Sequence, residues 1–236
     1  MKKGKLYLIP TTLGDFETAT QVLPSYNSML VHRLTDFIVE QVRTARRFLT
    51  ALQHPVSIDE MTFYELNKHT DLSDIGNYLD ATEEGRSIGL LSEAGTPCVA
   101  DPGALIVAQA HQKQIEVVPL VGPNSLLLAL MASGFNGQHF LFHGYLPIEN
   151  NARNRKIRAL EAAVYQQDQT QIFIETPYRN NKLFETLLKL LRPETKICMA
   201  VDLTLPTAFI RTKSVAQWKR QRTDLHKRPA VFLVYR

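Results

Sequence analysis

The chain has 236 residues, a length that accommodates one large domain or two small ones. Hydrophobic residues make up 44% of it, which allows a sizeable core, and no apolar run reaches the roughly 18 residues that a membrane-spanning helix needs. The formal net charge is +4, from 27 basic and 23 acidic side chains, and this excess alone gives only a hint of a polyanionic partner.

The first apolar segment, residues 5–9, is a predicted strand that ends at Pro10. It is too short for the apolar core of a signal peptide, so we expect a cytoplasmic protein. Helical patterns follow at residues 18–23, 25–33, 40–52 and 73–84, with predicted strands at 35–39 and 62–67. Strands that alternate with helices indicate a parallel sheet in this half of the chain.

The next stretch is a strand, helix, strand unit. Residues 87–91 read as a buried parallel strand, and 92–97 form a small-residue turn. A helix is expected over 104–114, with Asp101 as its N-cap and Pro102 in its first position, followed by a strand at 116–119. Ligands of open α/β sheets bind beside loops at the carboxyl ends of strands. A purely structural turn is the alternative, because the loop lacks the glycines of a phosphate cradle.

The second half begins with residues 125–133, an almost wholly apolar helix that we expect to be buried on all sides. Strands are predicted at 140–143, 171–175, 196–201, 208–212 and 231–235, with helices at 151–167, 180–191 and 215–221. The closely spaced final strands favour a mixed sheet. The expected domains are 1–119 and 120–236, and neither Cys98 nor Cys198 nor any histidine has metal-binding spacing, so no metal site is expected.

Six short motifs occur in a specific order along the chain. They are Leu8-Ile9-Pro10 with Leu13-Gly14-Asp15; residues 91–97 with Asp101-Pro102-Gly103; residues 118–125; residues 132–135; residues 140–147; and residues 173–179. In this order they resemble the tetrapyrrole methylase superfamily of S-adenosylmethionine-dependent methyltransferases. Within it they look most like the branch that methylates ribose 2'-hydroxyls of small-subunit ribosomal RNA.

The resemblance implies a homodimer of chains with two α/β domains, parallel and mixed, and the cofactor in the cleft between them. It places the methionine part of the cofactor against backbone groups of one loop and the adenine near the last strand. The implied cofactor contacts are Pro10; Glu93, Ala94, Gly95, Thr96 and Val99; Asn124 and Ser125; Thr176 and Leu203; and Pro229 and Ala230.

The sequence departs from the branch on the substrate side. The loop after the first strand is one residue shorter, and Glu40-Gln41-Val42-Arg43 stands where the branch has Glu-Asp-Thr-Arg. Residues 201–205 lack the cations found at both ends of the branch motif. These departures leave open a small tetrapyrrole-like substrate, or a cofactor-binding paralogue that has lost catalysis.

Methyl transfer from a sulfonium depends mainly on alignment, and a ribose hydroxyl gains from a base. Glu40, Glu175 and Asp202 each follow a predicted strand and are the candidate bases. Their alternative roles are capping helices or pairing with arginine. Arg43 and Arg179 are candidates to clamp a phosphate, with a solvated helix face or a structural ion pair as the alternative.

Basic residues are concentrated near the C-terminus. Residues 205–236 contain eight Lys or Arg and one Asp, and 153–158 add four more, a pattern that fits a phosphate backbone. A solvated basic face is the alternative. We therefore expect a methyltransferase that acts on ribosomal RNA or the small ribosomal subunit, with no membrane segment.

Overall fold

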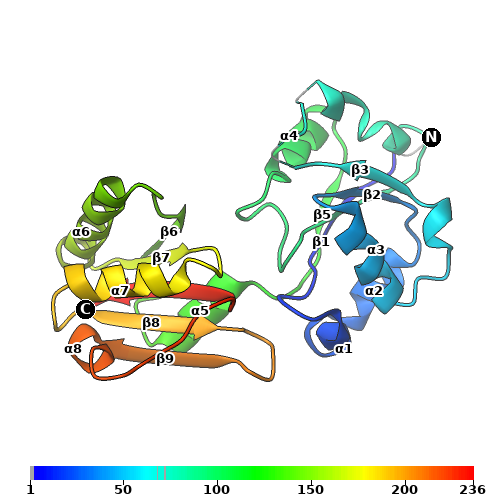
Figure 1. Cartoon of the computed structure of the whole chain (residues 1–236). Helices are drawn as coiled ribbons and strands as arrows, with labels where there is room; N and C mark the ends of the chain where they lie inside the picture. The colour runs from blue at the N-terminus through cyan, green and yellow to red at the C-terminus, as the bar shows by residue number, and fades with distance from the viewer. Residues whose placement is uncertain (1–2, 68, 72) are drawn as a thin grey trace. The chain divides into compact units, whose positions relative to one another are not determined.

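The computed structural model describes residues 3–67, 69–71 and 73–236. The chain divides into two compact units, one that ends at Asn124 and one over residues 125–236. Each unit contains a five-stranded sheet with helices packed on it (Figure 1).

The sheet of the N-terminal unit is entirely parallel, as predicted. Its strands are β1 (Leu6–Ile9), β2 (Asp36–Val39), β3 (Thr62–Glu65), β4 (Ile88–Leu91) and β5 (Val117–Pro119), in the order β3-β2-β4-β1-β5. Alternation along β2 places Phe37 and Val39 in one core and Ile38 in another. Helices therefore cover both faces of this sheet, which explains why its central strands are continuous apolar runs.

One face is covered by η1 (Phe16–Thr18), α1 (Ala19–Val22), α2 (Ser25–Val31) and α3 (Val42–Ala51), and the other by α4 (Ala104–Gln112). The short 3₁₀ turns are η2 (Ile58–Glu60), η3 (Asp74–Asn77) and η4 (Asp80–Thr82). The prediction of one helix over residues 73–84 was wrong, because η3 and η4 occupy this stretch. The carbonyl of Gly76 accepts from the side chains of Gln109 and Lys113 of the segment around α4, so the described part of this stretch forms only separate turns.

The sheet of the C-terminal unit is mixed, also as predicted. Its strands are β6 (Phe140–Tyr145), β7 (Thr170–Ile174), β8 (Lys196–Val201), β9 (Phe209–Ser214) and β10 (Ala230–Tyr235). The order is β6-β7-β10-β8-β9, with β6 and β7 parallel and the other neighbours antiparallel. One face carries α6 (Asn150–Gln167), α7 (Asn180–Leu190) and α8 (Val215–Trp218), and the other carries α5 (Ser125–Ser133).

Two apolar parts of the C-terminal unit differ in burial. Trp218 is a core residue, fully buried, and its ring N–H donates to the carbonyl of Ile197 at 2.9 Å. Helix α5, expected to be buried on all sides, packs on the sheet through one face, which includes Leu126, Ala129 and Leu130. Because a single sheet face lies beneath it, Met131 on its outer side is 79% exposed.

Candidate functional site

Three loops meet at the carboxyl edge of the parallel sheet, because the carboxyl ends of parallel strands share one edge. They follow β1, β4 and β5. The backbone N–H of Thr11 donates to the carbonyl of Gly95 at 3.0 Å, and the Gly95 N–H donates to Thr12 at 3.3 Å. The Asn124 amide donates to the hydroxyl of Thr96 at 2.6 Å. The structure thus brings together the contacts predicted for Pro10, Glu93 to Thr96 and Asn124.

Two glycines allow these loops to pack so closely. Gly95 has φ +75°, and a Cβ built on it would lie 2.8 Å from a methyl of Leu13 and 3.0 Å from the Pro123 carbonyl oxygen. A Cβ on Gly122 would lie 2.5 Å from the Cβ of Pro10. A side chain at position 95 therefore changes the loop itself, so substitution there is a poor probe of ligand binding alone.

The loop after β4 is closed by Asp101. Its carboxylate accepts from the backbone N–H of Cys98 and of Gly103, both at 2.8 Å. Helix α4 begins at Ala104, as predicted, but the prediction of Asp101 as its N-cap and Pro102 as its first residue was wrong. Gly103 is the N-cap, and Asp101 holds the preceding turn instead. Cys98 and Ala100 have φ of 66° and 64°, a conformation unfavourable for residues with a side chain. Such strain is typical of loops held for a function.

Three carboxyl groups lie near one another at this edge. Burial, followed by the neighbouring charges of Asp101 and Glu93, raises the pKa of Glu40 to about 7. Burial also raises the pKa of Glu93, while hydrogen bonds from the Thr44 hydroxyl and the Gln41 backbone oppose that rise. The Glu93 carboxylate thus faces the first turn of α3, where a negative group is stabilised.

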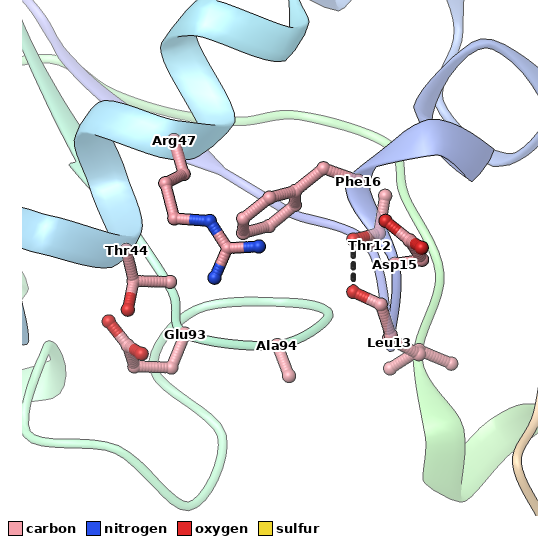
Figure 2. A pocket seen from close by; sticks show the side chains of 9 residues that line it. Thr12, Leu13, Asp15, Phe16, Thr44, Arg47, Glu93 and Ala94 are labelled. Carbon is pink, nitrogen blue, oxygen red and sulfur yellow. Dashed lines mark hydrogen bonds between the residues drawn. The ribbon is translucent and has the colours of Figure 1, made fainter.

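A cavity of about 330 Å³ opens beside this loop (Figure 2). It is lined by Thr12, Leu13, Gly14, Asp15, Phe16, Thr44, Arg47, Glu93 and Ala94. The Arg47 guanidinium lies over the Phe16 ring, 5.6 Å from its centre. The sequence analysis did not assign Arg47, Phe16, Thr12 or Thr44 to a site. The one available signal was the spacing of Arg47 four residues after Arg43, on the same face of a helix.

The second group of predicted residues gathers at one edge of the mixed sheet. Glu175 and Thr176 follow β7, and Asp202 and Leu203 follow β8. Strand β10 is antiparallel to both, so its start, at Pro229 and Ala230, lies at the same edge. The backbone N–H of Asp202 donates to the carbonyl of Pro229 at 3.0 Å. Ser125, the first residue of α5, belongs to this unit, and Leu203 packs against the core beneath that helix.

Both carboxylates at this edge are ion-paired. Glu175 is buried and pairs with Arg179 at 2.6 Å, and it also accepts from the Thr176 N–H at 2.7 Å. Asp202 pairs with Arg228 at 2.7 Å and accepts from a threonine hydroxyl. Glu175 and Asp202 therefore both have the alternative role considered for them, which is pairing with arginine.

The remaining candidates, Arg43 and Val99, are both exposed in the N-terminal unit. The loop after β8 has positive φ angles like those of the β4 loop, 49° at Asp202 and 70° at Thr204. Arg153, counted among the basic cluster, is buried and donates to Ile148 and Asn150. It therefore adds nothing to a basic surface.

The described residues include no group of three or more His, Cys, Asp or Glu side chains placed to hold a metal ion. The edge of the parallel sheet instead combines loop backbone, a small exposed side chain at Ala94 and a cluster of carboxyl groups. That combination suits a ligand with positive charge.

Comparison with known proteins identifies relatives along the whole chain. The family described as Tetrapyrrole (Corrin/Porphyrin) Methylases matches residues 26–217. Ribosomal RNA small subunit methyltransferase I of Vibrio cholerae is 32% identical over 234 residues, covering 98% of this chain and 76% of that protein. The protein of the same name from Escherichia coli O157:H7 is 29% identical over 235 residues, covering 98% and 78%.

Solved structures share the fold at lower identity. The methyltransferase CobJ superposes with a TM-score of 0.64 at 18% identity, covering 98% of this chain and 94% of that one. The cobalt precorrin-4 methyltransferase CbiF gives 0.61 at 13% identity, with the same coverage. These two likenesses establish the architecture.

Proposed function

The chain belongs to the tetrapyrrole (corrin/porphyrin) methylase family, and from that premise we propose that it methylates a ribose 2'-hydroxyl of small-subunit ribosomal RNA. It is an S-adenosylmethionine-dependent methyltransferase. The observation that carries the choice of substrate is the similarity over 98% of the chain to enzymes named for small-subunit ribosomal RNA.

The residues present fit S-adenosylmethionine, a ligand with a cationic sulfonium and ammonium, because Glu40, Glu93 and Asp101 supply negative charge beside the loop that follows β4. When bound, the cofactor supplies a methyl group that is already activated, so holding the acceptor in line provides most of the rate. The residues that would hold it are Pro10, Glu93, Ala94, Gly95, Thr96, Val99 and Asn124 in the N-terminal unit, and Ser125, Thr176, Leu203, Pro229 and Ala230 in the C-terminal unit.

Glu40 is the candidate that best suits the role of base. A carboxyl with a pKa of about 7 is substantially ionised at neutral pH and is a stronger acceptor than an ordinary carboxylate. Glu175 and Asp202 have arginine partners, so their proposed role is to position Arg179 and Arg228. Arg43, exposed on the first turn of α3, would contact a substrate phosphate.

The basic C-terminal segment supports an RNA partner, but fewer of its cations are available than its composition indicated. Arg228 and Arg236 pair with Asp202 and Asp168. Lys219, Arg220 and Arg222 are exposed and form no ion pair within the described residues. These three cations would contact the phosphate backbone, and their joint replacement by Ala should weaken RNA binding and flatten its salt dependence without altering cofactor affinity.

We also propose a homodimer that acts in the cytoplasm, where ribosomal particles are found. The support for association is the outer face of α5, where Leu127 is 49% and Met131 is 79% exposed. Within the described residues, the helices lack the length and apolarity to cross a membrane.

The proposed function is tested by mapping 2'-O-methyl groups in small-subunit ribosomal RNA from a strain that lacks this gene. One modification should disappear on deletion and return when the parent protein is supplied, but not with Glu40→Gln. An unchanged methylation map would rule out this substrate and favour a small tetrapyrrole-like acceptor or a non-catalytic cofactor-binding role. Full restoration by Glu40→Gln would instead reject the assignment of the base.

A further inference from the structure

Arg47 is a cation held over the cavity of Figure 2, and no carboxylate of the described residues is paired with it. It extends from α3 toward the cavity, and the Phe16 ring beneath its guanidinium packs in turn on the buried Phe48, with ring centres 5.7 Å apart. Within the described residues Arg47 forms no ion pair, whereas its neighbour Arg46 pairs with Asp59 at 3.6 Å. A cation–π contact thus orients this guanidinium while leaving its N–H donors available.

The acidic residues that line the same cavity are engaged elsewhere. Asp15 accepts from the backbone N–H of Glu17 at 3.2 Å and so caps η1. Glu93 accepts from the hydroxyl of Thr44 and from the first turn of α3. Among the described residues, neither carboxylate forms an ion pair with the guanidinium of Arg47.

A second cation extends this positive surface along α3. Arg43 and Arg47 are four residues apart, so they share one helix face and lie about 6 Å apart along the axis. Like charges at this spacing destabilise a helix, and Arg43 too forms no ion pair within the described residues. A ligand with two negative charges at a similar spacing would pair with both arginines, so relief of their repulsion would contribute to binding.

We propose that the cavity binds one phosphodiester-linked nucleotide of the RNA strand beside the methylated nucleotide, with Arg47 paired to its phosphate and Arg43 to the adjacent one. The proposal rests on the proposed function. The site borders Glu93 and Ala94, which belong to the loop assigned to the cofactor, so a nucleotide there would lie next to the reacting ribose. Its volume of about 330 Å³ is at the lower end for ligand pockets, which suits one nucleotide better than a macrocycle.

The test compares Arg47→Ala with Arg46→Ala, which removes the same charge one residue away but outside the cavity. Binding of a fluorescent single-stranded fragment of small-subunit RNA is followed by anisotropy, and S-adenosylmethionine binding by calorimetry. Arg47→Ala should weaken RNA binding roughly 10- to 100-fold and reduce the salt slope by about 0.7. Cofactor affinity should be unchanged, and Arg47→Lys should recover part of the RNA affinity.

The outcomes separate this proposal from the proposed function. Loss of cofactor affinity with unchanged RNA binding would assign the cavity to the cofactor and overturn the proposal. Equal weakening by Arg46→Ala, or no RNA binding by the parent, would also overturn it. Binding that depends on Arg47, in a parent that transfers no methyl group to small ribosomal subunits, would support the subsite and reject the proposed reaction.

Discussion

Replacing Glu40 by Gln should stabilise the protein at alkaline pH while it removes activity. Burial, Asp101 and Glu93 raise the pKa of this carboxyl from 4.5 to about 7. The folded state therefore holds the proton more tightly than the unfolded state does. The stabilising contribution of the protonated carboxyl is fully present below pH 4.5 and is lost as the pH rises to about 7.

The magnitude follows from the size of this pKa shift. At 1.36 kcal/mol per unit, the whole shift corresponds to about 3 kcal/mol. The side chain is partly exposed, so solvent screening reduces the expected effect to about 1–2 kcal/mol. Gln has nearly the same shape but no charge. The variant should therefore match the parent near pH 4 and exceed its free energy of unfolding by about 1–2 kcal/mol at pH 8.

The assay is urea unfolding of both proteins at several pH values between 4 and 8, with Glu60→Gln at an exposed position of the same unit as the control. Methyl transfer measured in parallel should fall about 100-fold or more if Glu40 is the base. The reasoning is refuted if Glu40→Gln is no more stable than the parent at pH 8, or if its gain is the same at pH 4.

Three further outcomes are expected. Gly122→Ala places a Cβ against the ring of Pro10, a proposed cofactor contact, so calorimetry should detect weaker S-adenosylmethionine binding. Unchanged affinity would show that Pro10 does not contact the cofactor. Trp218→Ala should lower the free energy of unfolding by about 3–5 kcal/mol in urea titrations, and a loss below about 1 kcal/mol would contradict its role in the core. Met131→Glu should shift the light-scattering mass from a dimer to about 26.8 kDa, whereas a persistent dimer would place the interface away from α5.

Local pattern was sufficient for most of the secondary structure and for the type of each sheet. Helix α5 and strand β8 have the boundaries predicted from residues 125–133 and 196–201, because a long apolar segment between turn residues depends little on its surroundings. The parallel sheet followed from the alternation of strands and helices, and the mixed sheet from the closely spaced final strands. The order of motifs also located the loops around Gly95 and Asn124.

Only the tertiary structure decided the electrostatics and the exposure of these groups. The pKa of Glu40 depends on Glu93 and Asp101, which are more than 50 residues away in the sequence, and the orientation of Arg47 depends on a ring from the loop after β1. Likewise, the exposed side of α5 follows from its having a sheet on one face only. Burial and charge interactions are set by neighbours that folding brings together, so no local pattern contains them.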